Sequence, residues 1–284
     1  MSDDNISEKH HASTQEALKR IQTADSVLLP IPRDAFEKLY LTPKTPAAGQ
    51  LRRTFGNPTP VALMGFLLAA TPNSMAAMGW RGAGGNGGAI LPVFIFFGGI
   101  VQIFGAVGEW LLNNTFSCVL FFTYGSFWIA QGTSLMPFFA VGTNYASSGN
   151  TLQGIQTPEY NATVGLYYVT LAIVTAVYLM CSIRTNVSLF LALFFLVITF
   201  ALFAAVYFQN ALGNTATAAK LQVAGGACNF VVCLPIWHIF IAQICEAVDF
   251  PFAIPVGDLS TIVIGRSQKA RRKANRSDQD VTAQ

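Results

Sequence analysis

The charged residues of this chain are segregated along the sequence, and this segregation limits the possible folds more than any other feature. Between Asn57 and Phe250 the chain has six long apolar stretches, with only seven charged residues among or between them. All other acidic and basic residues lie in the first 56 or the last 34 positions. A soluble domain must spread charge over its surface, so the middle of the chain is predicted to be surrounded by lipid. The seven charged residues are Arg81, Glu109, Glu159, Arg184, Lys220, Glu246 and Asp249.

The apolar stretches are long enough to be helices that cross a bilayer. One crossing needs about 20 predominantly apolar helical residues. With 52% hydrophobic residues, the chain has little material left for a soluble domain. Membrane β-strands alternate in runs of about ten residues, and no such alternation occurs here. The predicted fold is an all-α polytopic membrane protein, a compact bundle of six transmembrane helices at 60–80, 90–112, 115–141, 162–183, 187–208 and 221–247.

The basic residues predict how the bundle is oriented. Residues 1–56 hold eight Lys or Arg, residues 251–284 hold six, and each connection between stretches holds at most one. Basic residues favour the cytoplasmic side, so both termini are predicted to be cytoplasmic, which requires an even number of spans. We therefore expect three regions: a polar N-terminal tail at 1–56, a six-helix transmembrane domain at 57–250, and a basic C-terminal tail at 251–284.

The first predicted span opens on Asn57, Pro58, Thr59 and Pro60. Asn is a favoured N-cap and Pro a favoured first helical residue. The amino end of a helix also carries partial positive charge, which suits an anion. The motif is therefore either a simple cap or the place where an anionic substrate enters.

Polar side chains inside the apolar stretches are candidates for contact with a substrate. No Lys or Arg lies near a predicted midplane, so an anion would be held weakly by hydroxyls, amides and helix dipoles. In the third stretch, Tyr124 and Trp128 share a helix face, and with Thr123 and Ser126 nearby they suit either a constriction or ordinary packing. We predict that the supporting polar residues are Gln102, Glu109, Thr123 and Ser126.

Other features favour the simpler of two interpretations. Residues 81–88, RGAGGNGG, contain a G-x-G-x-x-G pattern, but it lies between two predicted spans rather than in a βαβ unit, so we expect an external turn. The His, Asp, Glu and Cys residues show no catalytic or metal-ligand spacing. We predict no enzyme activity, no metal and no cofactor, and we expect no disulfide between cysteines that all fall in predicted spans.

Several of these motifs together resemble the acetate uptake transporter family, also called the succinate–acetate permease family. Residues 57–63 are similar to its Asn-Pro-Ala-Pro-Leu-Gly-Leu signature, with Thr59, Val61 and Ala62 as departures. Ala62 replaces Gly, and we expect its methyl group to alter helix approach. The long polar N-terminal tail looks more like the fungal members than the short bacterial ones. The other similar segments are 98–104, Glu109, 114–116, 124–128 and 255–259.

The resemblance implies a fold, an assembly and a substrate class. It implies six helices per protomer, a homohexamer, and passage of acetate and related short monocarboxylates, with succinate in some members. It also implies an apolar constriction in each protomer, whose residues fall here on Phe66, Tyr124 and Leu196.

The resulting prediction is a plasma-membrane acetate carrier or channel, either proton-coupled symport or facilitated flow. Two alternatives remain: ammonia or ammonium export, and a membrane sensor that reports on acetate through its tails.

Overall fold

The computed structural model describes residues 55–259, 262–266 and 269, all within the unit Pro46–Gln284. Nearly all of the predicted N-terminal tail, and most of the C-terminal tail, lie outside the described residues. In the described part the regular elements are helical, and a single antiparallel bridge joins Asn186 to Asp258. The predicted all-α class is confirmed.

Six long helical segments account for the six apolar stretches. The first is α4 (Thr59–Ala77). The second is continuous from Gly85 to Leu111 and comprises η2 (Gly85–Ile90), α5 (Leu91–Val93), the π-helix η3 (Phe94–Val101) and α6 (Gln102–Leu111). The others are α7 (Thr115–Ser134), α9 (Pro158–Ser182), α10 (Val187–Ala211) and α11 (Thr215–Ala247). The short elements are η1 (Trp80–Gly82), η4 (Pro137–Phe139), η5 (Thr143–Tyr145) and α8 (Thr151–Gly154).

Five of these segments are long and apolar enough to cross a membrane by length and composition: α4, 85–111, α9, α10 and α11. The remaining long helix, α7, has 20 residues, and several of them are polar. It ends at Ser134, before the predicted limit of 141, because Pro137 cannot continue a helix. The sixth crossing and the cytoplasmic termini therefore remain predictions.

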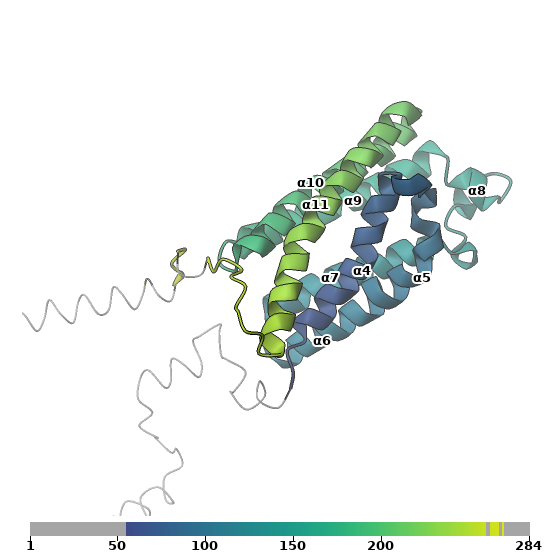
Figure 1. The fold of residues 1–284 in the computed structure, drawn as a ribbon. Helices are drawn as coiled ribbons and strands as arrows, with labels where there is room; N and C mark the ends of the chain where they lie inside the picture. Colours follow the sequence, from purple (N-terminus) through teal and green to yellow (C-terminus); the bar gives the residue numbers. More distant parts are fainter. Residues whose placement is uncertain (1–54, 260–261, 267–268, 270–284) are drawn as a thin grey trace, which may run out of the picture. The chain divides into compact units, whose positions relative to one another are not determined.

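The long helices pack in a closed order. The helix α10 packs against both α9 and α11, and α11 also packs against α4 (Figure 1). The second helix then packs between α4 and α7. Hydrogen bonds from α7 to α9 complete the circuit, with Tyr124 Oη 3.1 Å from Thr175 Oγ1 and Thr123 Oγ1 2.9 Å from Tyr178 Oη. A ring of helices can enclose a space between them.

Small residues bring α4 close to the second helix. A Cβ placed on Gly65 would lie 2.5 Å from the carbonyl oxygen of Phe97. A Cβ on Gly105 would lie 2.5 Å from the Cβ of Ala62, which is fully buried. The methyl group of Ala62, expected to alter helix approach, therefore packs against a glycine of the partner helix.

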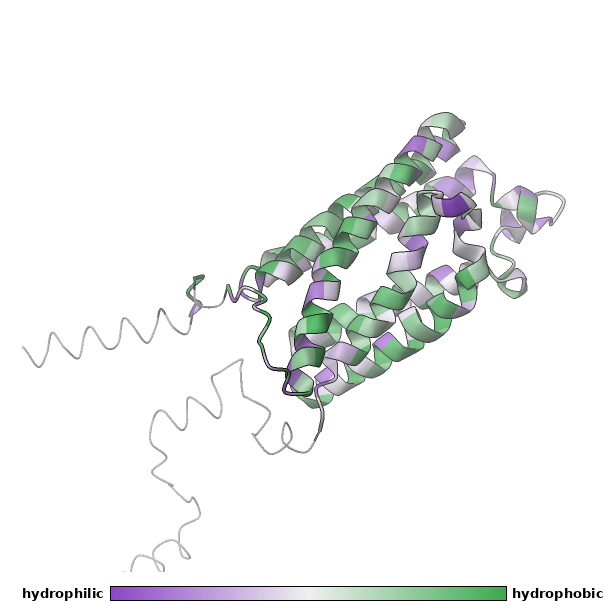
Figure 2. Cartoon of the chain, viewed as in Figure 1, coloured by the Kyte–Doolittle hydropathy of each residue, from purple (hydrophilic) through white to green (hydrophobic). Residues whose placement is uncertain are grey.

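The outward faces of the helices are apolar. Figure 2 shows long hydrophobic runs along the helices, with hydrophilic residues gathered mostly near their ends. Large side chains such as Phe104, Ile173 and Leu234 are more than half exposed. Such surfaces are stable in contact with lipid, which agrees with a multi-pass membrane protein.

Candidate substrate pathway

The ring of helices surrounds a partly open cavity of about 360 Å³. Its walls come from α4, α7, α10 and α11, from Tyr168 of α9, and from the turn around Gly84. The described residues that line it include no acidic, basic or histidine side chain. The volume lies within the range of roughly 300–1,000 Å³ that is usual for small-molecule sites.

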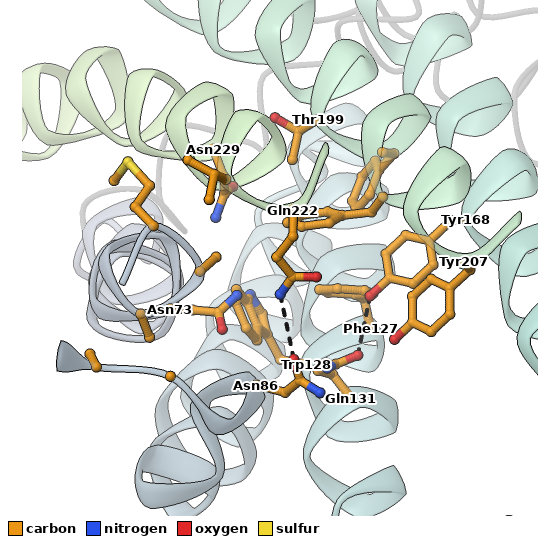
Figure 3. A pocket seen from close by; sticks show the side chains of 18 of the residues that line it. Asn73, Asn86, Phe127, Trp128, Gln131, Tyr168, Thr199, Tyr207, Gln222 and Asn229 are labelled. Atoms are coloured by element: carbon orange, nitrogen blue, oxygen red, sulfur yellow. Dashed lines mark hydrogen bonds between the residues drawn. The ribbon is translucent and has the colours of Figure 1, made fainter. Parts of the chain in front are cut away.

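Five carboxamide side chains supply much of the polar lining, and Figure 3 shows them around the cavity. Gln222 Nε2 donates to Asn86 Oδ1 at 3.4 Å, and the Tyr168 hydroxyl donates to Gln131 Oε1 at 3.3 Å. An amide has both donors and acceptors, so these groups can replace part of the hydration shell of an ion of either sign. The five are Asn73, Asn86, Gln131, Gln222 and Asn229.

These five amides were not singled out from the sequence. Asn73, Gln131, Gln222 and Asn229 each interrupt an apolar stretch, and a polar side chain at membrane depth is itself a signal of function. Asn86 belongs to the glycine-rich segment at 81–88, which was predicted to be only an external turn. The structure places Gly84, Gly85 and Asn86 in the cavity wall.

The three residues that the resemblance placed at a constriction lie together. Phe66, Tyr124 and Leu196 come from α4, α7 and α10, and all three line the cavity. Each is buried, with 8%, 6% and 5% of its surface exposed, respectively. Tyr124 is fixed by its hydrogen bond to Thr175 and by stacking on Phe200, with 6.3 Å between ring centroids. Control of passage by these residues is a proposal taken up below.

Trp128 lies one helical turn beyond Tyr124 and also lines the cavity, as their shared helix face predicts. Its side chain is only 3% exposed, and its indole ring packs against Phe66, Phe94 and Phe127. Its Nε1–H has no hydrogen-bond partner in the described part of the chain.

The predicted supporting residues occupy other positions. Thr123 is bonded to Tyr178 of α9, and Ser126 is exposed. Gln102 is buried in the contact between α6 and α4, where its backbone nitrogen would lie 3.0 Å from a Cβ on Gly65. None of the three is among the cavity-lining residues.

The carboxylate of Glu109 contacts the first turn of α4. Asn57 Oδ1 accepts from the amide of Thr59 at 3.1 Å. The Thr59 hydroxyl donates to Glu109 Oε1, and Asn114 Nδ2 donates to Glu109 Oε2 at 2.7 Å. Glu109 is 2% exposed, so this supporting residue joins three segments rather than lining the cavity. A role for residues 57–60 where the substrate enters remains a prediction.

The sequence analysis also predicted that the chain has no metal site. Among the residues that the structure describes, no three His, Cys, Asp or Glu side chains form a group that could hold a metal ion. His238 instead has its Nδ1 2.8 Å from the Ser188 hydroxyl, a contact between α11 and α10.

The helices present apolar faces outward, which defines a polytopic membrane protein. They surround a cavity whose described lining consists of amides, aromatic rings and other uncharged side chains, which suits the passage of small polar solutes. Residues 40–261 match the model of the GPR1/FUN34/yaaH family. The chain belongs to this family, so the membership that its motifs predicted is confirmed.

Relatives match over most of the chain. Protein alcS of Aspergillus fumigatus is 35% identical over 88% of this chain and 91% of its own length. Acetate permease A of Emericella nidulans is 26% identical over 89% of this chain and 81% of its own length. Ammonia transport outward protein 2 of Saccharomyces cerevisiae is 27% identical over 72% of this chain and 68% of its own length.

A solved structure shares the fold. The bacterial acetate channel SatP superposes with a TM-score of 0.57 at 24% identity, covering 72% of this chain and 99% of its own. The alignment supports the helical architecture described above.

Proposed function

We propose that this protein carries acetate and related short-chain monocarboxylates across a membrane, through a pathway within the protomer. The observation that carries the proposal is the cavity itself, whose described lining is uncharged and includes amides together with Phe66, Tyr124 and Leu196. The printed names of two similar proteins, an acetate permease and an acetate channel, support the same substrate.

The cavity's chemistry suits transient binding of a small anion. A carboxylic acid with a pKa of about 4 to 5 is ionised at neutral pH. Amide N–H groups can donate to its oxygens and repay part of its dehydration. Because the lining residues that the structure describes include no Lys, Arg or His, the ion is not captured tightly, and weak binding favours fast passage.

The residues that bound the cavity account for control of passage. Phe66, Tyr124 and Leu196 come from three different helices, so a small shift between helices changes the width of the space between them. We assign the constriction to these three residues. Their apolar surfaces raise the cost of a hydrated ion at this point, so passage requires brief dehydration.

The finer features follow from the same proposal. We place the protein in the plasma membrane as a homohexamer, with α7 as the sixth span and both termini in the cytoplasm. The basic tails support the cytoplasmic termini, and the apolar outer faces support a location in a membrane. Proton-coupled symport and channel-like flow are the two mechanisms to be separated.

Ammonium export is the second candidate. Aromatic rings line much of the cavity, among them Tyr124, Trp128, Tyr168 and Phe200, and ring faces attract cations. An ammonia-exporting relative supports it as well. None of the described residues that line the cavity carries a carboxylate to hold the cation, so acetate remains the better fit.

The test is uptake of radiolabelled acetate by proteoliposomes, with and without an imposed pH gradient. We expect uptake above that of empty vesicles, and a large loss of uptake in F66A and Y124A. Stimulation by an inward proton gradient identifies symport, and indifference to it identifies facilitated flow. Folded wild-type protein that takes up no acetate refutes the proposal.

Deleting residues 1–50 tests the sensor alternative. A transport protein whose pathway lies in the described helices keeps its uptake without the tail. A tail-driven sensor loses its signal.

A further inference from the structure

One residue that lines the cavity carries a buried donor for which the described part of the chain supplies no partner. Three buried side-chain atoms lack a hydrogen-bond partner in the described part of the chain: Gln102 Oε1, Trp128 Nε1 and Gln243 Oε1. Only Trp128 lines the cavity, and only its atom is a donor. Orphaned buried donors are rare in folded proteins, so each calls for an explanation.

The indole of Trp128 is held in place on several sides. Phe94 lies over it with 5.1 Å between ring centroids and 31° between planes, and Phe127 meets it edge-on at 5.3 Å. A Cβ on Gly98 would lie 2.6 Å from the indole Cγ, so the second helix passes directly against the ring. This packing leaves the ring little freedom to turn, and the direction of its N–H is set by the fold.

Figure 3 draws Trp128 with Asn73 and Gln222 around the same hollow. Phe66, one of the proposed constriction residues, contacts the indole with 6.5 Å between centroids. The Trp128 side chain, which carries the unpaired N–H, therefore belongs to the part of the cavity wall next to the proposed constriction.

We propose that the Trp128 indole N–H donates a hydrogen bond to a carboxylate oxygen of the substrate beside the constriction, and so selects anions over ammonium. This inference rests on the proposed function. An indole N–H only donates. It matches a carboxylate, whereas an ammonium ion offers no acceptor and would leave the N–H unpaired.

The neighbouring groups cannot make this selection. The amides of Asn73 and Gln222 both donate and accept, as does the Tyr124 hydroxyl, so they suit either ion. Cation binding to an aromatic ring uses the ring face, whereas the Trp128 N–H lies at the ring edge and only donates. The sign of the preferred ion is therefore set at Trp128 Nε1.

Indole ¹⁵N NMR of the full-length protein in nanodiscs tests the contact without relying on transport. The chain has four tryptophans, and W128F assigns the signal of interest. We expect sodium acetate to shift the Trp128 N–H signal saturably, and sodium chloride and ammonium chloride to leave it in place. Trp237, whose Nε1 already donates to Thr71 Oγ1 at 3.2 Å, is the internal control. An acetate-insensitive Trp128 signal, or an equal shift with ammonium chloride, overturns the inference.

Replacing Trp128 with benzothienylalanine tests its effect on transport. This analogue keeps the shape of the ring and has sulfur in place of N–H, so the packing against Phe94 and Gly98 is retained. We expect the half-saturating acetate concentration to rise about tenfold, as for the loss of one hydrogen bond to a charged group. The same analogue at position 237 is the matched control and should change it little.

The outcomes separate the two claims. Wild-type vesicles that take up no acetate refute the proposed function. Wild-type uptake together with an unchanged half-saturating concentration in the position-128 analogue refutes only the role of Trp128.

Discussion

The buried carboxylate of Glu109 leads to a prediction about stability. It accepts hydrogen bonds from Thr59 of α4 and from Asn114 at the start of α7, while its own backbone belongs to α6. In E109A both donors lose their partner. A hydrogen bond to a charged group contributes about 1.5–3 kcal/mol. Because Thr59 and Asn114 are only partly buried and water can replace some of the loss, we expect a total cost of about 3 kcal/mol, near the lower limit for two such bonds.

The E109Q substitution separates charge from shape. A glutamine keeps one oxygen that can accept from Thr59, but its amide group faces the donor of Asn114. We expect E109Q to lose about half as much stability as E109A, roughly 1.5 kcal/mol. Glu246, which is exposed at the end of α11, is the matched control, and E246A should change stability by no more than about 0.5 kcal/mol.

A thiol-reactive dye measures the unfolding of these variants in detergent. Cys233 is 1% exposed and Cys118 is 7% exposed, so both thiols become reactive when the bundle opens. We expect the midpoint temperatures to fall in the order wild type and E246A, then E109Q, then E109A. Equal midpoints for E109A and E246A would refute a structural role for the buried carboxylate.

Three further predictions concern the cavity wall. G98A adds a methyl group 2.6 Å from the Trp128 Cγ. We expect overpacking to lower the free energy of unfolding by about 1–3 kcal/mol and to shift the Trp128 indole NMR signal. An unshifted signal would contradict the packing described. Y124F removes the hydroxyl bonded to Thr175 and should lower the unfolding temperature by the same amount as T175V. If the losses add in the variant that carries both substitutions, the two residues do not share a hydrogen bond. L196A removes bulk from the proposed constriction and should raise uptake of longer acids such as butyrate relative to acetate, and an unchanged ratio in a competition assay would place the constriction elsewhere.

The helices could be predicted from the sequence because hydropathy acts locally. Each of the six apolar stretches became a helical segment, since a chain in lipid must satisfy its backbone hydrogen bonds internally. Hydropathy locates helix ends less well. The helix α11 begins at Thr215, six residues before the predicted stretch, because a helix continues into polar sequence until a residue such as Gly213, with a φ of 78°, interrupts it.

The site was predicted only in part, because its contacts join distant residues. The family resemblance assigned Phe66, Tyr124 and Leu196 to a constriction, and the structure places them in one cavity. The bond from Thr59 to Glu109 was not predictable, since it spans 50 positions. Ser126 has a suitable side chain but faces outward, because helix rotation depends on packing that one sequence does not reveal. The unpaired donor of Trp128 could be found only from three-dimensional contacts.

The most direct test of the account compares two labelled solutes in one batch of proteoliposomes containing the wild-type protein. The account predicts saturable uptake of radiolabelled acetate that unlabelled short-chain acids inhibit, and uptake of radiolabelled methylammonium no greater than in empty vesicles. Protein-dependent uptake of methylammonium without uptake of acetate would contradict the account and establish the ammonium pathway in its place.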